Sequence, residues 1–249
     1  MTAITRVEVP SPSGSDASPA DLRAALDQAL GTEAKLRRTI ERQARQLREK
    51  SDLLTEVNHR AKNNLQMAIA LLSMQALSSD DTRVAAALGA ASQRLGYLAR
   101  VHELLYQRGG DAQEIELSGF LRDIGGALEE AFRREEVAVS YRLTPLALEG
   151  SRAISVGLIV GEAMLNSYKY AFSAGAPGRI DVSCTREGTM VRLAVTDDGA
   201  GFPAEERRGS LGMRLLRALG RSLGGETIVT SGGGTAVVVA FPLSAPAES

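Results

Sequence analysis

The stretch "LLTEVNHRAKNNLQMAIALL", Leu53 to Leu72, decides how the first half of this chain folds. Its apolar residues recur at intervals of three and four, which is the spacing along one face of an α-helix. With successive residues set about 100° apart, these residues fall in a stripe about 60° wide. The stripe comprises Leu54, Val57, Ala61, Leu65, Ala68 and Leu72. The stretch therefore predicts an amphipathic helix.

His59 lies roughly 160° from the centre of this stripe, beside Asn63 and Gln66, so we expect it to face water. An exposed neutral imidazole is a competent nucleophile. The cations Arg60 and Lys62 would offset the charge of an incoming phosphate. On charge alone, the alternative that this segment is merely a solvated helix surface remains open.

The other histidine, His102 in "ARVHELLYQ", is expected to have a packing role. It falls next to a second apolar stripe, formed by Ala91, Leu98, Val101 and Leu105.

Upstream of Leu53, the composition predicts two segments. Residues 1–20 are rich in Ser, Pro and small residues and are expected to form a disordered tail. From residue 21 a long polar helix with a thin apolar seam indicates a coiled coil, weakened locally at Gly31.

Downstream of Leu72, "SSDD" (78–81) predicts a turn with a capping residue, and residues 82–107 predict a second helix. Two long helices joined by a short turn form an antiparallel hairpin that buries only one side of each helix. A four-helix bundle in a dimer would complete its packing. We assign residues 21–110 to this coiled coil and hairpin.

After Gly110 the pattern alternates between short strands and helices, which predicts an α+β domain with one sheet over residues 111–245. The expected helices are 118–135, 151–172 and 211–225. The expected strands are 112–117, 137–143, 178–187, 189–197, 226–231 and 234–243.

The composition excludes several classes of protein. A net charge of −1 in 249 residues argues against a nucleic-acid binder, and the single cysteine, Cys184, excludes an internal disulfide and a multi-cysteine zinc site. No apolar run is long enough for membrane insertion, and the N-terminus does not resemble a signal peptide. We therefore expect a soluble, cytoplasmic protein.

Three motifs of the second domain predict a nucleotide site. In "GEAMLNSYKYAF", spacings of four and three place Glu162, Asn166 and Lys169 on one helix face. A carboxylate, an amide oxygen and a cation together suit Mg²⁺ and phosphate. Taken alone, this motif is also common on exposed helix surfaces.

The second motif is "VTDDGAGFP", in which a strand ends at Asp197 and is followed by Gly199 and Gly201. A buried carboxylate here could accept a hydrogen bond from the exocyclic amine of adenine, while the glycines let the backbone approach the base. The alternative is an ordinary Asp-Gly turn.

The third motif, "GSLGMRLLRALG", opens a helix with Gly209, Ser210 and Gly212. The free N–H groups at a helix start bind phosphate, although a plain glycine turn gives the same pattern. The occurrence of all three motifs in this order favours the nucleotide site.

These residues resemble a known family. "EVNHRAKNNLQ" is similar to the phosphoacceptor box of the sensor histidine kinases whose box has the form H-R-x-K-N-N-L-Q, and "VHELLYQ" is similar to their second helix. "GEAMLNSYKYAF", "DDGAGF", "GSLGM" and "GGTAVVVAFP" resemble the asparagine and glycine boxes of Bergerat-fold ATPases. The resemblance implies a helical hairpin followed by an α/β sandwich that binds ATP.

The resemblance also implies residue roles. His59 would accept the γ-phosphoryl group of ATP, Asn166 would coordinate Mg²⁺, Glu162 would polarise water or the metal shell, and Lys169 would contact phosphate. Asp197 would hold adenine. The remaining ATP-binding positions would be Tyr170, Gly199, Gly201, Gly209, Ser210, Leu211, Gly212 and Thr235. Two positions depart from the family pattern, since Asn58 and Tyr170 stand where these kinases often have histidine.

The function implied is an ATP-dependent protein-histidine kinase of a two-component system. It would pass the phosphoryl group to an aspartate in the receiver domain of a response regulator, and a separate sensory partner or the coiled coil would supply the input. Two alternatives remain: a degenerate phosphotransfer scaffold that does not use ATP, and an anti-sigma-type kinase acting on Ser or Thr of a partner.

Overall fold

The computed structural model describes residues 19–108, 114–132, 134–201 and 211–244. The chain divides into two compact units, residues 1–60 and residues 61–249. The expected disordered tail therefore falls almost entirely outside the described residues. The side chains of Asn58 and His59 are also outside the description, although both residues lie within a helix.

In the first unit, the described residues belong to the helix α1 (Pro19–Leu77), which extends into the second unit. The helix runs through Gly31 without a break, because one glycine lowers helix stability by only about 1 kcal/mol. The expected seam is exposed in the single chain, with Leu26, Leu30 and Ile40 each more than half exposed. The coiled coil remains a prediction.

The second unit begins with the predicted hairpin, formed by residues 61–77 of α1 and by α2 (Thr82–Gln107). The side chain of Asp81 accepts hydrogen bonds from the backbone N–H groups of Arg83 and Val84 at the start of α2. This N-cap confirms the turn predicted from "SSDD". The helices pack through small side chains, and the hydroxyls of Ser73 and Ser92 lie 2.9 Å apart.

The sheet domain contains five main strands in the order β2-β4-β5-β7-β6. Their bounds are β2 (Val137–Leu143), β4 (Gly178–Glu187), β5 (Met190–Asp197), β6 (Glu226–Ser231) and β7 (Thr235–Pro242). β2 and β4 are parallel, whereas the other neighbours are antiparallel. This architecture confirms the predicted fold class.

A second, two-stranded sheet pairs β1 (Glu114–Glu116) with β3 (Ala147–Glu149), so the prediction of one sheet was incomplete. β3 has only three residues, too few to show an alternating pattern, and the sequence gives no sign of it.

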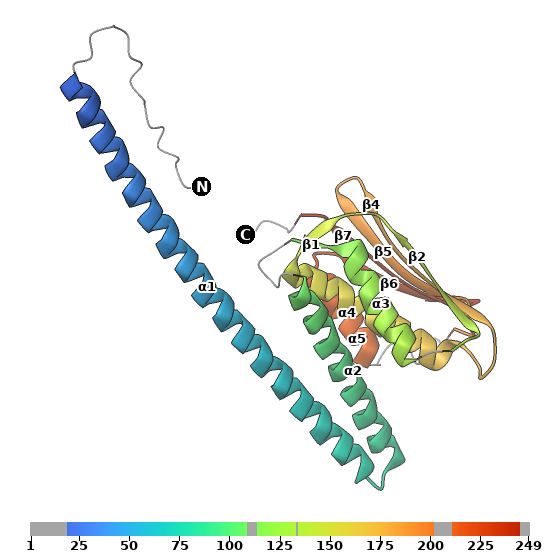
Figure 1. The fold of residues 1–249 in the computed structure, drawn as a ribbon. Coiled ribbons are helices and arrows are strands. Elements are labelled where there is room, and N and C mark those ends of the chain that lie inside the picture. Colours follow the sequence, from blue (N-terminus) through green and yellow to red (C-terminus); the bar gives the residue numbers. More distant parts are fainter. Residues whose placement is uncertain (1–18, 109–113, 133, 202–210, 245–249) are drawn as a thin grey trace. The chain divides into compact units, whose positions relative to one another are not determined.

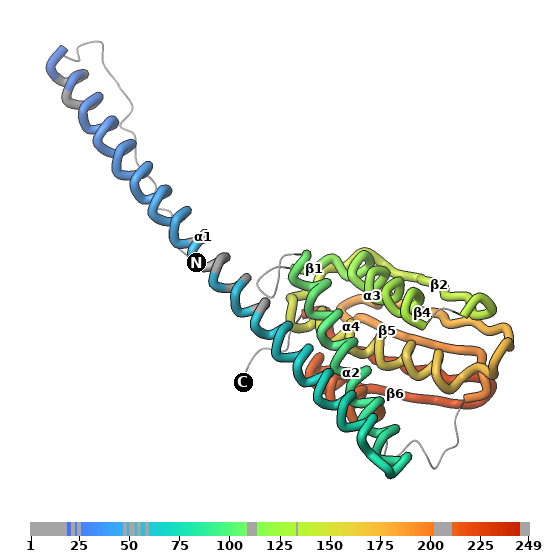
Figure 2. Tube along the Cα trace, turned by 60° about the horizontal axis from the view of Figure 1, so that its bottom comes forward, coloured from blue at the N-terminus to red at the C-terminus, as the bar shows by residue number. Residues whose placement is uncertain are grey.

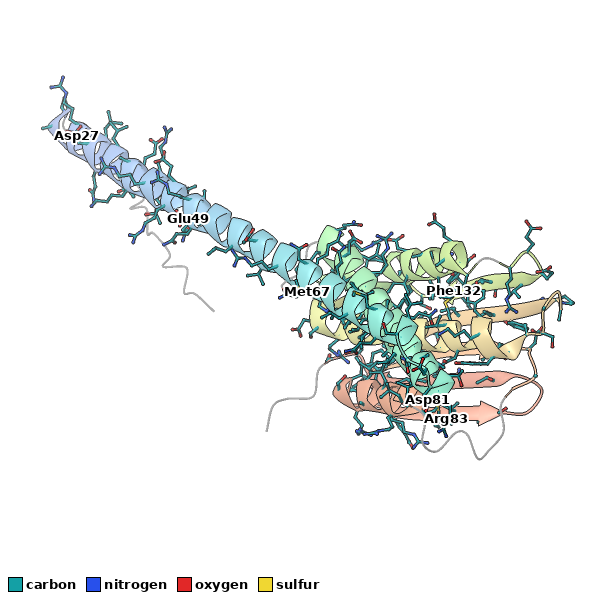
Figure 3. All side chains as sticks on the ribbon, turned by 90° about the horizontal axis from the view of Figure 1, so that it is seen from below. Asp27, Glu49, Met67, Asp81, Arg83 and Phe132 are labelled. Atoms are coloured by element: carbon teal, nitrogen blue, oxygen red, sulfur yellow. The ribbon has the colours of Figure 1, made fainter. Side chains whose placement is uncertain are left out.

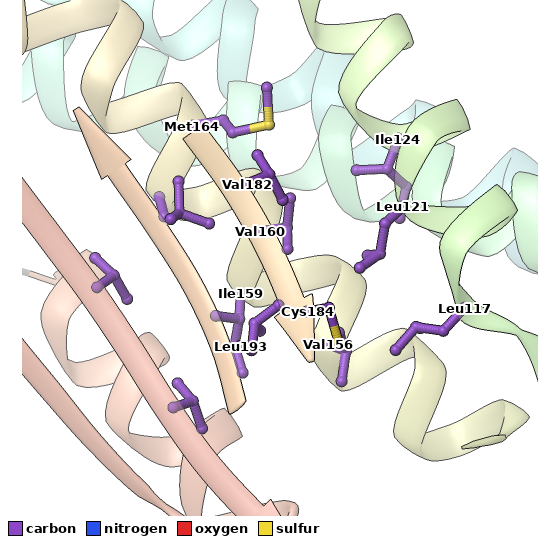
Figure 4. Packing of buried hydrophobic residues seen from close by; sticks show 14 of the residues in the cluster. Leu117, Leu121, Ile124, Val156, Ile159, Val160, Met164, Val182, Cys184 and Leu193 are labelled. Atoms are coloured by element: carbon purple, nitrogen blue, oxygen red, sulfur yellow. The ribbon is translucent and has the colours of Figure 1, made fainter. Parts of the chain in front are cut away.

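The helices α3 (Leu117–Ala131), α4 (Gly150–Asn166) and α5 (Leu211–Ser222) cover one face of the five-stranded sheet (Figure 1). Buried residues alternate with more exposed ones along the strands, and opposed pairs such as Val182–Val195 and Leu193–Val239 form the sheet side of the core. In Figure 4, Val160 and Met164 of α4 lie close to Val182 of β4, in the same buried cluster. The one-sided burial explains the period-two pattern of the strands.

The end of α2 also belongs to this core. Val101 and Leu105 are fully buried and cluster with residues of α3 and α4, and the three helices run side by side (Figure 1, Figure 2). The last turns of the hairpin and the sheet domain therefore share one hydrophobic core.

The predicted helix 151–172 divides into α4 and a π-helical turn, η1 (Ser167–Ala171). The hydroxyl of Ser167 donates to the carboxylate of Asp197 on β5 and lies 3.2 Å from the Ala163 carbonyl. The widened turn depends on this contact between elements, which a helical periodicity cannot reveal.

Candidate active site

Asp197, at the end of β5, is a fixed and buried carboxylate. Its Oδ2 accepts a hydrogen bond from Ser167 Oγ at 2.7 Å, and its Oδ1 accepts from the backbone N–H groups of Gly199 and Thr235, each at 3.1 Å. Only 8% of the residue is exposed. An ionised carboxylate offers about four lone-pair positions, so three bonds leave room for one further donor.

The backbone around Asp197 packs too closely for side chains. A Cβ on Gly199 would lie 2.2 Å from the carbonyl oxygen of Ala171, and one on Gly234 would lie 2.0 Å from the carbonyl oxygen of Asp197. Gly201 has a φ of +67°, in the left-handed region that favours glycine. The sequence therefore needs glycine at Gly199 and Gly201 for local geometric reasons.

Glu162 and Asn166 of α4 lie together, as their spacing predicted. Asn166 Nδ2 donates to Glu162 Oε1 at 3.5 Å, and only 3% of Glu162 is exposed. The amide oxygen of Asn166 accepts no hydrogen bond within the described part of the chain. A Cβ on Gly212 would lie 2.2 Å from Glu162 Oε1, so the start of α5 is packed directly against this carboxylate.

The sequence did not predict that Arg94, on α2, binds Glu162. Arg94 Nε lies 3.1 Å from Oε1 and 3.0 Å from Oε2 of Glu162, and Arg94 Nη2 lies 2.9 Å from Oε1. Beside this pair, Lys169 donates to the side-chain oxygen of Gln93. Partial burial lowers the pKa of Lys169, the positive charge of Arg94 lowers it further, and Glu162 opposes both effects.

Two glycines on α4 allow α2 to approach closely. The hydroxyl of Tyr97 donates to the carbonyl oxygen of Gly157, and a Cβ on Gly161 would lie 1.6 Å from Tyr97 Cζ. Burial raises the pKa of Tyr97 well above its usual range. The Tyr97 ring therefore occupies the space that a side chain at Gly161 would fill, whereas a Cβ on Gly157 would lie 2.7 Å from Ile124 Cδ1.

Several other predicted site residues are exposed in the single chain or are not described. Tyr170 is 67% exposed and Leu211 is 57% exposed. Gly209 and Ser210 lie outside the described residues. His102 is half-buried and stacks on Tyr106, with ring centroids 6.3 Å apart, in keeping with the expected packing role.

The two cations near His59 are each paired with a carboxylate. Arg60 Nε lies 2.7 Å from Glu56 Oε1 within the first unit, and Lys62 Nζ lies 2.9 Å from Glu103 Oε1 within the second. Each pairing uses only one N–H donor of the cation, so further donors remain for a phosphate.

The site lacks the ligands of an all-protein metal cage. Among the described residues there is no group of three or more His, Cys, Asp or Glu side chains that could hold a metal ion. The amide oxygen of Asn166 fits a hard divalent cation that takes its other ligands from phosphates and water.

None of the described helices has the length and apolar character needed to cross a membrane.

Comparison with known families gives two matches. Residues 56–132 match the family described as "Histidine kinase", and residues 151–245 match the family described as "Histidine kinase-, DNA gyrase B-, and HSP90-like ATPase". The second match contains the motifs around Glu162, Asp197 and Gly212, and it assigns this part of the chain to an ATP-binding fold.

Individual relatives agree with these matches. The chain is 34% identical over 203 residues to blue-light-activated histidine kinase 2 of Erythrobacter litoralis, covering 77% of this chain and 57% of the relative. It is 28% identical over 185 residues to the sensor histidine kinase PdtaS of Mycobacterium tuberculosis, covering 72% of this chain and 36% of the relative. The chain thus spans between about a third and somewhat more than half the length of these curated relatives.

The fold also matches a solved structure. The histidine kinase domain of the E. litoralis blue-light activated histidine kinase EL346 superimposes with a TM-score of 0.57 and 27% identity. The alignment covers 73% of this chain and 96% of that domain.

Proposed function

Because the chain belongs to the histidine kinase family, we propose that it is an ATP-dependent protein-histidine kinase that phosphorylates itself on His59. The phosphoryl group would then pass to an aspartate in the receiver domain of a response regulator. We further propose residues 21–110 as the coiled coil and phosphotransfer hairpin, and residues 111–245 as the catalytic domain.

The observation that carries this proposal is the buried carboxylate of Asp197 at the end of a central strand. Three neutral donors hold it in place, and one acceptor position remains for the exocyclic amine of adenine. A buried polar group is costly unless its hydrogen-bonding positions are filled, so a position left open at Asp197 favours a ligand that donates to it. This observation argues against the scaffold that does not use ATP, and the match of residues 56–132 to a histidine kinase family argues against the Ser/Thr kinase.

The other residues are assigned by position. The Asn166 amide oxygen would take a place in the shell of Mg²⁺, which would neutralise the charge of the phosphates when bound. The N–H groups at the start of α5, near Gly212, would bind phosphate oxygens. Such a site acts by positioning and charge neutralisation, which is what phosphoryl transfer requires.

We also propose that the protein is a homodimer through its hairpin. On the part of α1 in the second unit, Met67, Leu71 and Met74 share one helix face and are each more than half exposed in the single chain; Figure 3 labels Met67. Apolar side chains in such a row are typical of a helix surface that a second copy covers.

The test is incubation with Mg²⁺ and γ-labelled ATP of the wild type and the variants His59→Ala, Asp197→Asn and His102→Ala. The wild type and His102→Ala should acquire an acid-labile label. His59→Ala should acquire none because it lacks the nucleophile, and Asp197→Asn little, because its adenine acceptor is uncharged. Thermal unfolding of each variant controls for loss of the fold.

Label that persists in His59→Ala but disappears in His102→Ala would show that the phosphoryl group is carried by His102 and not by His59. Failure of the folded wild type to bind ATP would refute the kinase assignment in favour of a scaffold. A label stable to acid would instead indicate phosphorylation of Ser or Thr.

A further inference from the structure

The helices α2 and α4 are joined by a two-point polar contact, which we call the α2–α4 clasp. It consists of the ion pair between Arg94 and Glu162 and the hydrogen bond between Gln93 and Lys169. The side chain of Glu162 is 4% exposed and that of Arg94 is 25% exposed, so water screens the ion pair only weakly. None of the residue roles proposed above requires this contact.

The clasp uses the same groups that the nucleotide would need. Glu162 Oε1 receives the Nε and Nη2 groups of Arg94 and the amide of Asn166, while Oε2 receives Nε of Arg94. A carboxylate oxygen has about two lone pairs, so Oε1 has none left for a water of the metal shell, whereas Oε2 keeps one. Lys169, the proposed phosphate contact, is held toward α2 by Gln93, which takes one of its three N–H donors.

Arg94 lies at the end of the site where the phosphates of the nucleotide are expected to bind. A Cβ on Gly212, at the start of α5, would lie 3.1 Å from Arg94 Nη2. The guanidinium is therefore next to the helix start where phosphate is expected to bind. The carboxylate of Asp197, at the proposed adenine end, takes no part in the clasp.

Arg94 and Mg²⁺ would perform the same electrostatic task for Glu162. A carboxylate buried to this degree needs a positive partner, and removal of one partner leaves an uncompensated charge. Arg94 is that partner here, and a hydrated divalent cation would be an alternative one. The two cannot both take the same lone pairs.

We propose that the α2–α4 clasp is a latch that competes with Mg²⁺–ATP for Glu162 and Lys169. This inference rests on the proposed function, because it concerns the same nucleotide site. With the latch closed, α2 of the histidine-bearing hairpin is held to the phosphate end of the site. Binding of Mg²⁺–ATP frees Arg94 and Gln93, and by reciprocity the clasp weakens nucleotide binding by the factor by which nucleotide weakens the clasp.

The test compares the affinity of the full chain for Mg²⁺–ATP and for adenosine by calorimetric titration. Arg94→Ala should bind Mg²⁺–ATP about tenfold more tightly than the wild type, a factor typical of one charge-assisted contact. Its affinity for adenosine should be unchanged, since the clasp does not touch the adenine end. A defect in folding would weaken both ligands, so a gain for one of them is specific.

Two matched variants sharpen the result. Arg83→Ala removes an arginine from the same helix whose side chain is 92% exposed, near the turn of the hairpin (Figure 3), and should change neither affinity. Arg94→Lys keeps the charge but not the paired Nε and Nη2 geometry, and should give an intermediate gain.

Equal or weaker affinity of Arg94→Ala for Mg²⁺–ATP, with wild-type binding intact, would overturn the latch and leave the kinase assignment standing. Weaker affinity would identify Arg94 as a phosphate contact instead. If no variant binds ATP, the proposed function itself fails, so the two failures are distinguishable.

A second measurement does not depend on the gain in affinity. In the absence of nucleotide, Arg94→Ala and Glu162→Gln should have non-additive effects on the unfolding midpoint, because they remove the same contact. Saturating Mg²⁺–ATP should abolish this coupling. Coupling that persists unchanged in nucleotide would contradict the competition.

Discussion

The contact between α2 and α4 can be tested at Gly161. Adding a methyl group there should lower the free energy of unfolding when Tyr97 is present and raise it when Tyr97 is replaced by alanine. A Cβ at this position would lie 1.6 Å from Tyr97 Cζ, far inside van der Waals contact. The ring cannot easily retreat, because its hydroxyl is bonded to the carbonyl oxygen of Gly157. Gly161→Ala must therefore displace the ring or the helix.

The expected magnitude follows from three terms. Replacing glycine by alanine inside a helix stabilises it by about 1 kcal/mol. Overpacking costs about 1–3 kcal/mol, and loss of the Tyr97 hydrogen bond costs about 1 kcal/mol. Gly161→Ala should therefore lower the free energy of unfolding by about 1–3 kcal/mol. In a Tyr97→Ala background the clash is absent, and the same change should raise the free energy of unfolding by up to about 1 kcal/mol.

The assay is urea unfolding of the four proteins of this cycle, monitored by circular dichroism. Gly126→Ala is the matched control, because Gly126 lies inside α3 and a methyl group there would meet no neighbouring atom within 4 Å, so the change should stabilise in both backgrounds. If Gly161→Ala has the same sign with and without Tyr97, α2 is not packed on α4 through this ring. The basis for the clasp would then fail as well.

Two further predictions concern ionisable groups. Hydrogen bonds from Lys62 and then Arg100 lower the pKa of Glu103 below its ordinary 4.5. The stability that these contacts contribute is therefore present above pH 4.5 and is lost as pH falls through the lower folded-state pKa. The destabilisation caused by Lys62→Met at pH 7 should shrink below pH 4.5 in urea titrations, and an effect independent of pH would contradict the pairing. Burial raises the pKa of Cys184 to about 12. This residue is the only thiol of the chain, and it should resist a disulfide reagent at pH 8 in the folded protein but react fully in urea. Rapid labelling of the native protein would show that the reagent reaches the core.

Elements defined by their own sequence could be predicted closely. The bounds of α2 follow from a capping aspartate and a continuous apolar stripe, and β2, β4 and β6 follow from alternation along each strand. The same local logic placed Glu162 beside Asn166, since a spacing of four residues fixes their proximity on a helix. The glycines after Asp197 lie where the chain packs closely on itself, and their expected place beside adenine stays a prediction.

Contacts between distant segments could not be predicted. The partner of Glu162 is 68 residues away in sequence, and the hydroxyl that holds Asp197 is 30 residues away. Ser167 reads as an ordinary helix residue until the π-helical turn directs it toward β5. Gly161 lies on a buried helix where another element approaches closely, but nothing in the sequence around it identifies Tyr97 as the residue that fills the space.

The residues of the α2–α4 clasp share a property that suits a contact made to open. Gln93, Arg94 and Lys169 are well solvated when exposed, so separating α2 from this part of α4 costs much less than exposing apolar side chains would. Val101 and Leu105, further along the same helix, are fully buried and form a permanent contact. α2 thus has an apolar end anchored in the core and a polar segment with replaceable partners. A sequence pattern that looks like ordinary solvated helix therefore suits the reversible contact that we propose between the hairpin and the nucleotide site.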